Sequence, residues 1–149
     1  MLFPDAQIYA LFSELPLVEG RTVGRSPMSK LLRPHPTGVR VTHALSDGER
    51  VEVGDLRVQA FALPGHTEGS AAYLADGVLF LGDAASAKKD GHVKGPAWVF
   101  SDDARQGRES LQRLAARLSH DYAPVTALAF AHSGPIVGDD VLVRLSRPE

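Results

Sequence analysis

Three side chains that can bind a metal ion or take part in catalysis stand directly beside short apolar runs. His66 lies in the loop 64–67 (P-G-H-T), Asp83 follows one apolar run, and His132 follows another. Imidazole and carboxylate groups bind zinc, iron and manganese, and a carboxylate can bridge two ions. Each residue also has a plain structural interpretation: a loop histidine bonded to backbone, a turn cap and a satisfied core residue, respectively. The local pattern alone does not decide between a metal site and a catalytic site.

A β-hairpin is expected to position the first two of these residues. The apolar runs Ala71–Leu74 and Val78–Leu81 flank an Asp-Gly pair at 76–77, which supplies the positive φ angles of a tight turn. Pairing of the two strands would hold His66 and Asp83 in a fixed relation at the ends of the hairpin.

Further segments have the composition of strands. They are Gln7–Leu11, Val39–Leu45, Glu49–Val53, Leu56–Leu63 and Val125–Phe130. The third and fourth flank a Gly-Asp pair and predict a second hairpin. The last has no apolar–polar alternation, which is typical of a strand buried on both faces.

A long amphipathic helix is the clearest helical pattern in the sequence. Apolar residues recur at helical spacing at Ala104, Leu111, Leu114, Ala115 and Leu118. Ser101 is the expected N-cap, and the two aspartates that follow it suit the positive end of the helix dipole. A short helix is expected over Glu14–Glu19 with Ser13 as its cap, whereas Asp139–Arg147 fits either a strand or a helix.

Two glycine-containing segments predict surface loops near the candidate site. Gly20–Pro36 combines glycines and prolines with basic residues, which we interpret as a solvated face rather than an anion-binding lip. Ala84–Phe100 is expected to cross the opening of the site. Trp98 and its neighbours Val99 and Phe100 are expected to anchor this second loop to the core.

The composition excludes several classes of protein. With 149 residues, 44% apolar and 23% charged, the chain fits one ordered domain over 1–149. A net charge of −2 gives no electrostatic case for nucleic acid or an anionic membrane. The absence of cysteine excludes disulfides and cysteine-bound zinc. Neither a secretory signal pattern nor an apolar run of transmembrane length occurs, so a cytoplasmic location is the default expectation.

Taken together, the motifs resemble the metallo-β-lactamase superfamily, which includes the lactamases and the glyoxalase II-like thioester hydrolases. The matching residues are P-G-H-T-E-G-S at 64–70, L-G-D at 81–83 and A-H-S-G-P at 131–135. The resemblance extends roughly from Phe3 to Val137. The H-x-H-x-D-H run that such enzymes carry upstream occurs nowhere in the sequence.

The resemblance implies an α/β (α+β) fold that is half of a four-layer αββα sandwich. The chain would be the C-terminal half of that domain, a mostly antiparallel sheet covered by helices. One half alone exposes an apolar sheet face, so we expect either a homodimer or a separate polypeptide that supplies the other half. A start codon assigned too late, a deliberately shortened chain and a natural half-domain all explain the missing run, and the sequence does not separate them.

The resemblance also assigns roles to the candidate residues. His66 would bind a first metal ion, His132 a second, and Asp83 would lie between them and orient the attacking hydroxide. Only about two protein ligands per ion remain, so zinc, or alternatively iron or manganese, would be held at partial occupancy. Thr67, Glu68 and Ser70 are expected to support the ligands from behind.

Two functions remain open at this point. The first is a metal-dependent hydrolase of small molecules, in which a metal-bound hydroxide attacks an ester, thioester or amide-type bond. This chain would supply only part of the metal site and alone would be weakly active or inactive. The second is an inactive, metal-poor half-domain that serves assembly or protein interaction. The sequence does not reveal the substrate.

Overall fold

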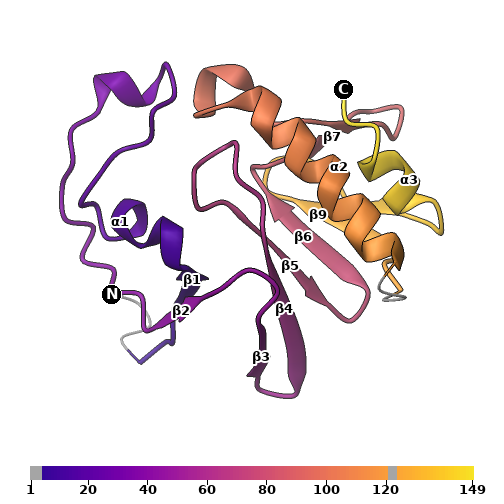
Figure 1. Cartoon of the computed structure of the whole chain (residues 1–149), viewed down its shortest axis with the longest axis horizontal. Coiled ribbons are helices and arrows are strands. Elements are labelled where there is room, and N and C mark those ends of the chain that lie inside the picture. The colour runs from indigo at the N-terminus through magenta and orange to yellow at the C-terminus, as the bar shows by residue number, and fades with distance from the viewer. Residues whose placement is uncertain (1–4, 121–123) are drawn as a thin grey trace.

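The centre of the molecule is a six-stranded sheet. The computed structural model describes residues 5–120 and 124–149. Within them the strand order is β10-β9-β6-β5-β4-β3. The strands are β3 (Arg50–Val53), β4 (Leu56–Ala62), β5 (Ala71–Ala75), β6 (Val78–Gly82), β9 (Ala127–Phe130) and β10 (Ile136–Val137) (Figure 1). All neighbours are antiparallel except β6 and β9, which are parallel. The mixed α/β class and the mostly antiparallel sheet are confirmed.

Smaller elements surround this sheet. They are the strands β1 (Tyr9–Leu11), β2 (His43–Leu45), β7 (Ser86–Ala87) and β8 (Val93–Lys94), the helices α1 (Leu15–Val18), α2 (Ala104–His120) and α3 (Val141–Leu145), and the 3-10 turns η1 (Phe12–Glu14), η2 (Ser29–Leu31) and η3 (Trp98–Phe100). The segment Asp139–Arg147 is thus helical. Ser13, the expected helix cap, lies inside η1 instead. Among residues 5–120 and 124–149, no helix is long and apolar enough to cross a bilayer.

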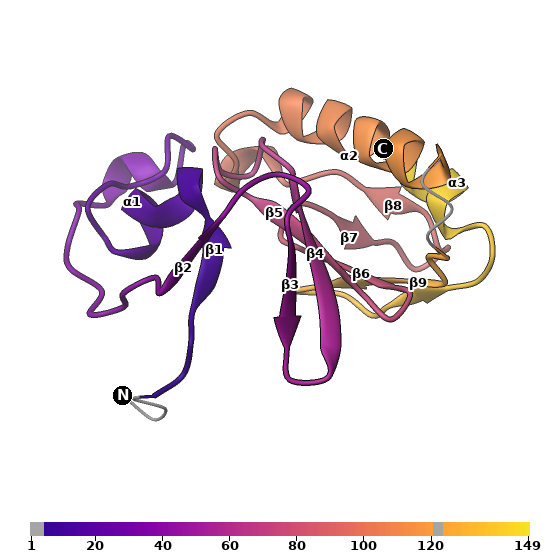
Figure 2. The same ribbon diagram turned by 60° about the horizontal axis from the view of Figure 1, so that its bottom comes forward.

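Helices cover one face of the sheet. Figure 2 shows α2 and α3 on the same side of it. Leu111 and Leu118 of α2 pack in one buried cluster with Phe61, Leu79 and Leu128 of the sheet. The apolar stripe predicted for this helix is therefore confirmed, and its burial stabilises the sheet and the helix together.

The N-cap of α2 is Asp103 and not the predicted Ser101. Asp103 Oδ1 accepts hydrogen bonds from the N–H groups of Gln106 and Arg105, both at 2.9 Å. These bonds, chiefly that from Gln106, lower the pKa of Asp103. The Ser101 hydroxyl donates instead to the carbonyl of Ala97 at 2.7 Å. The Ser101 side chain therefore does not cap the helix and can contact the candidate site instead.

The predicted hairpin that connects the candidate residues is confirmed. Its turn has positive φ at Asp76 (45°) and Gly77 (77°), and Ala75 pairs with Val78. The prediction for β9 was wrong in one respect. Only Leu128 of this strand is buried, because α2 covers one face and the other face remains accessible.

The sheet face opposite α2 carries apolar side chains that reach solvent. Leu79 and Leu81 face α2, so Phe80 between them points the other way and is 48% exposed. Val137, next to the buried Ile136, is 73% exposed. The surface, here called the open sheet face, comprises Val78, Phe80, Ala129 and Val137.

The N-terminal segment covers only one end of that side of the sheet. Strands β1 and β2 form a short parallel pair, in which Leu11 lies opposite Leu45. Both side chains pack on Ala60 of β4, away from β9 and β10. An exposed apolar face of this kind was expected for half of a sandwich.

The loop that carries His66 meets the start of α2 at two glycines. Gly65 has φ +146°, and a Cβ atom there would lie 2.2 Å from Cα of Gly107. The carbonyls of Gly65 and His66 accept hydrogen bonds from the N–H groups of Asp103 (2.9 Å) and Asp102 (3.0 Å). The loop is therefore fixed against the helix by close backbone contact.

The substitution Gly65→Ala is expected to destabilise the fold by about 2–4 kcal/mol, because the new methyl group overlaps backbone atoms that cannot rotate away. Gly54→Ala is the matched control, since Gly54 also has positive φ (60°) but has no atom within 4 Å of the added Cβ. Its cost should be only about 1 kcal/mol. Urea unfolding measures both, and equal losses would contradict the close contact.

Candidate active site

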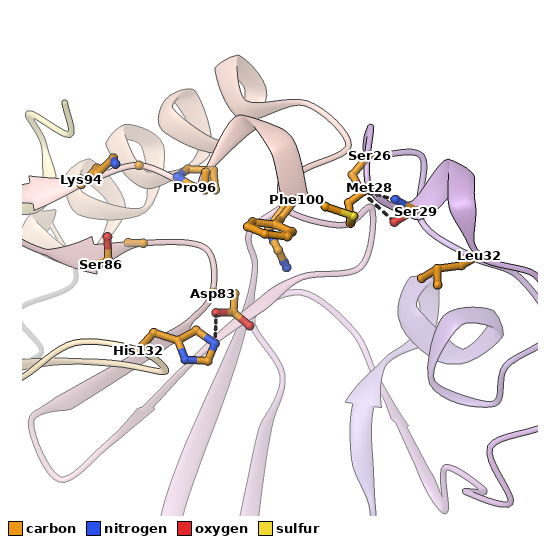
Figure 3. Close-up of a pocket in the computed structure, with 14 residues that line it drawn as sticks. Ser26, Met28, Ser29, Leu32, Asp83, Ser86, Lys94, Pro96, Phe100 and His132 are labelled. Carbon is orange, nitrogen blue, oxygen red and sulfur yellow. Dashed lines mark hydrogen bonds and ion pairs between the residues drawn. The ribbon is translucent and has the colours of Figure 1, made fainter.

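Asp83 and His132 are brought together by the pairing of β6 with β9. Because these strands are parallel, their carboxyl ends lie at the same edge of the sheet. The N–H of Ala131 donates to the carbonyl of Gly82 at 3.1 Å. Asp83 Oδ1 and His132 Nε2 are 3.2 Å apart, as Figure 3 shows. Both side chains are exposed, and either can contact a bound molecule.

His66 lines the same pocket from the loop between β4 and β5. Its Nδ1 lies 3.3 Å from Ser101 Oγ. The Ser101 hydroxyl already donates to the carbonyl of Ala97, so its oxygen accepts a hydrogen bond from the Nδ1–H group of His66. This arrangement favours the tautomer in which Nε2 carries the lone pair, which a metal ion or a proton can take.

A pocket of about 550 Å³ has all three candidate residues in its wall. The two loops predicted near the site complete it. Met28 and Leu32 come from the first loop, and Pro96 and Phe100 from the second (Figure 3). The second loop therefore lies in the wall of the pocket, and its crossing of the opening stays a prediction.

The anchor predicted for the second loop was wrong. Trp98 is 71% exposed and Phe100 is 53% exposed, so neither side chain is buried in the core. Both belong to η3, whose backbone hydrogen bond from Ser101 N–H to Trp98 O (3.3 Å) turns the chain towards α2. An aromatic run in a glycine-rich loop favoured packing, but the turn directs these rings outward.

The three candidate ligands do not make a complete metal site. Within the part of the chain that the structure describes, no three histidine, aspartate or glutamate side chains come close enough to hold one ion. Asp83 and His132 form a pair. A tetrahedral zinc ion with ligands at about 2.0–2.2 Å places its donor atoms about 3.3–3.6 Å apart, close to the separation of these two. The pair thus fits part of one ion's ligand set.

Thr67, which was expected behind the ligands together with Ser70, binds a carboxylate that the sequence did not single out. Thr67 Oγ1 lies 2.8 and 2.9 Å from the two carboxylate oxygens of Glu14. It is also 2.7 Å from Ser70 Oγ, and the N–H of Gly69 donates to Glu14 Oε2 at 2.9 Å. Glu14 therefore holds the His66 loop from the N-terminal segment.

This contact spans more than fifty residues of sequence, so no local pattern predicts it. Burial raises the pKa of the Glu14 carboxyl, and the hydrogen bonds from Thr67 and Gly69 oppose that shift. Glu68, the third residue expected behind the ligands, points to the surface. Its carboxylate lies 3.3 Å from the Arg25 guanidinium.

The stability of this loop should depend on pH through Glu14. Its pKa is higher in the folded protein than the usual 4.5, so the folded state holds the proton more tightly. The associated stability is present at low pH and is lost as pH rises through the folded pKa. The free energy of unfolding relative to that of Glu14→Gln should fall across this window. Urea titrations at a series of pH values measure it, and a difference that increases with pH would refute the effect.

Comparison with known proteins supports the motif-based interpretation. No family model matches the chain. The hydroxyacylglutathione hydrolase of Aliivibrio fischeri is 36% identical over 105 residues, which are 66% of this chain and 38% of that protein. The chain thus spans about two fifths of the length of that curated relative.

Solved structures share the fold. A metallo-β-lactamase of Novosphingobium pentaromativorans gives a TM-score of 0.60 at 21% identity, over 95% of this chain and 56% of that one. A metallo-β-lactamase family protein of Thermus thermophilus gives 0.56 at 23% identity, over 94% of this chain and 50% of that one. The chain therefore has the fold of part of a metallo-β-lactamase and matches about half of each of these two structures.

Proposed function

We propose that this chain contributes part of the active site of a metal-dependent hydrolase that cleaves an ester, thioester or amide-type bond. Hydrolysis adds water across the acyl bond and gives a carboxylate and a thiol, alcohol or amine. The observation that carries the proposal is the Asp83–His132 pair in the wall of a pocket that His66 also lines. The named relative, a hydroxyacylglutathione hydrolase, supports a hydrolase of small molecules.

Three residues of this chain would act as metal ligands. Asp83 and His132 offer two donor atoms to an ion, and His66 offers Nε2 because Ser101 holds its Nδ1. Zinc is the first choice for such donors, with iron and manganese as alternatives. When bound, the ion supplies Lewis acidity that lowers the pKa of water towards neutrality. The remaining ligands would come from outside this chain.

Zinc binding tests the ligand assignment. The chain alone should bind zinc weakly, and Asp83→Ala and His132→Ala should each lower the affinity about tenfold or more. Asp55→Ala and His43→Ala are the matched controls, because Asp55 lies in the β3–β4 turn and His43 stacks on Tyr9 at 4.5 Å. Equilibrium dialysis measures all four variants. Equal zinc binding by all four variants would refute the assignment of Asp83 and His132 as ligands.

The rate of thioester hydrolysis tests whether this chain holds only part of the active site. The purified chain should hydrolyse simple thioesters slowly, since several metal ligands are missing. Any turnover should be lost on adding a chelator and in Asp83→Ala. Turnover at the rate of a complete enzyme, from this chain alone, would contradict a partial site.

A second candidate function is assembly without catalysis. Two observations favour it: the described residues contain no three-ligand group, and the open sheet face leaves Phe80 and Val137 in solvent. Such a face is stabilised when it is buried against another apolar surface. A second copy of this chain would provide one, and a complementary half-domain would provide both that surface and the missing ligands.

A measurement of self-association distinguishes a second copy of this chain from a complementary half-domain as the partner. We expect the chain to dimerise through the open sheet face, and Val137→Lys to weaken the dimer about tenfold or more, because a charge would be buried there. Val143→Lys is the matched control, since Val143 is also exposed (56%) but lies on α3. Light scattering over a range of concentrations measures both. A monomer at every concentration would exclude the homodimer and leave the complementary half-domain as partner.

A further inference from the structure

The pocket wall that faces Asp83 and His132 is apolar and exposed. Phe100, Met28 and Leu32 line it, as Figure 3 shows, and they are 53%, 43% and 60% exposed. Three large apolar side chains gathered on one wall of a pocket are stabilised when an apolar ligand covers them.

The two loops that form this wall are joined to each other and to the His66 loop. The N–H of Met28 donates to the carbonyl of Val99 at 3.2 Å, which links the first loop to the second. The backbone N–H of Arg25 donates to Asp102 Oδ1, and the N–H of Asp102 donates to the carbonyl of His66. The apolar wall is thus built at a defined position relative to the candidate ligands, before any ligand arrives.

The candidate ligands of the pocket lie apart from this wall, and the two serines beside Met28, Ser26 and Ser29, are hydrogen-bonded to each other at 2.7 Å. The candidate ligands His66, Asp83 and His132 mark one region, and Met28, Leu32 and Phe100 mark another (Figure 3). A matching ligand is polar at one end and apolar along its remaining length. A volume of about 550 Å³ is within the usual range for small-molecule sites.

This apolar wall is also distinct from the open sheet face. None of the residues that define that face, such as Phe80 and Val137, lines the pocket. The wall is concave and has candidate catalytic groups beside it, whereas the open sheet face is one side of a sheet. The two apolar surfaces therefore require different occupants.

We propose that the pocket selects acyl compounds with an extended apolar chain or ring, which lies on Met28, Leu32 and Phe100 while the carbonyl group points towards Asp83 and His132. The orientation of the carbonyl rests on the proposed hydrolase function. The preference for an apolar chain rests on the wall alone. Each methylene group that becomes buried should raise the affinity about fourfold.

Binding of unreactive amides tests the proposal without metal or turnover. N-methyloctanamide should bind at least about tenfold more tightly than N-methylacetamide in the presence of a chelator. Met28 is one of two methionines in the chain, so isotope-labelled methionine methyl groups give a nuclear magnetic resonance signal in the wall. That signal should shift on titration with the longer amide. Equal affinity for the two amides would overturn the proposal.

Variants locate the binding site. Phe100→Ser and Leu32→Ser should each weaken binding of N-methyloctanamide several-fold, because both side chains are already exposed and their loss costs little stability. Phe12→Ser is the matched control, since Phe12 is 73% exposed and does not line the pocket. Equal loss in all three variants would overturn the assignment of the wall. So would a Met28 signal that follows protein concentration without ligand, which would mark a contact between copies.

The outcome is separable from that of the hydrolase proposal. A chain-length preference in amide binding, together with absent zinc binding, would support the apolar pocket and refute the metal site. Chelator-sensitive hydrolysis that is equally fast for acetyl and octanoyl thioesters would support the metal site and refute the apolar pocket.

Discussion

The parallel pairing of β6 with β9 is the constraint on which the candidate site depends. It is the single parallel contact of the six-stranded sheet described here, and a parallel connection requires a long crossover. The crossover contains α2, whose apolar stripe closes the core over the sheet. The same connection therefore builds the hydrophobic core and places Asp83 beside His132, so the site cannot form without the fold.

Sequence patterns correctly predicted the elements that are determined by residues close together in the sequence. The Asp-Gly turn at 76–77, the stripe of α2 and the loop around His66 each follow from the types and spacing of a few neighbouring residues. The three candidate residues were found through motifs at the ends of strands. Their common pocket then follows from the sheet, because β6 and β9 end at the same edge.

Sequence patterns gave wrong or no predictions where a side chain binds a segment that is distant in the sequence. Ser101 and Asp103 are both good helix caps, and the choice depends on His66 and the carbonyl of Ala97, which occupy the serine hydroxyl. Glu14 fits a helix start, yet its partners Thr67 and Gly69 lie on another loop. The burial of β9 on a single face could not be predicted either, because it depends on which surface covers the sheet and not on the strand itself.

The two facing glycines have a mechanical consequence for the pocket. Gly107 touches the His66 loop through Gly65, and a Cβ atom at Gly107 would lie 2.4 Å from Cγ of Pro96, which also lines the pocket. The His66 loop and Pro96 thus both lie against one turn of α2. A ligand that displaces Pro96 would press on the helix and, through Gly107, on the loop that carries His66. The first turn of α2 therefore sets the spacing between Pro96 and the loop that carries His66.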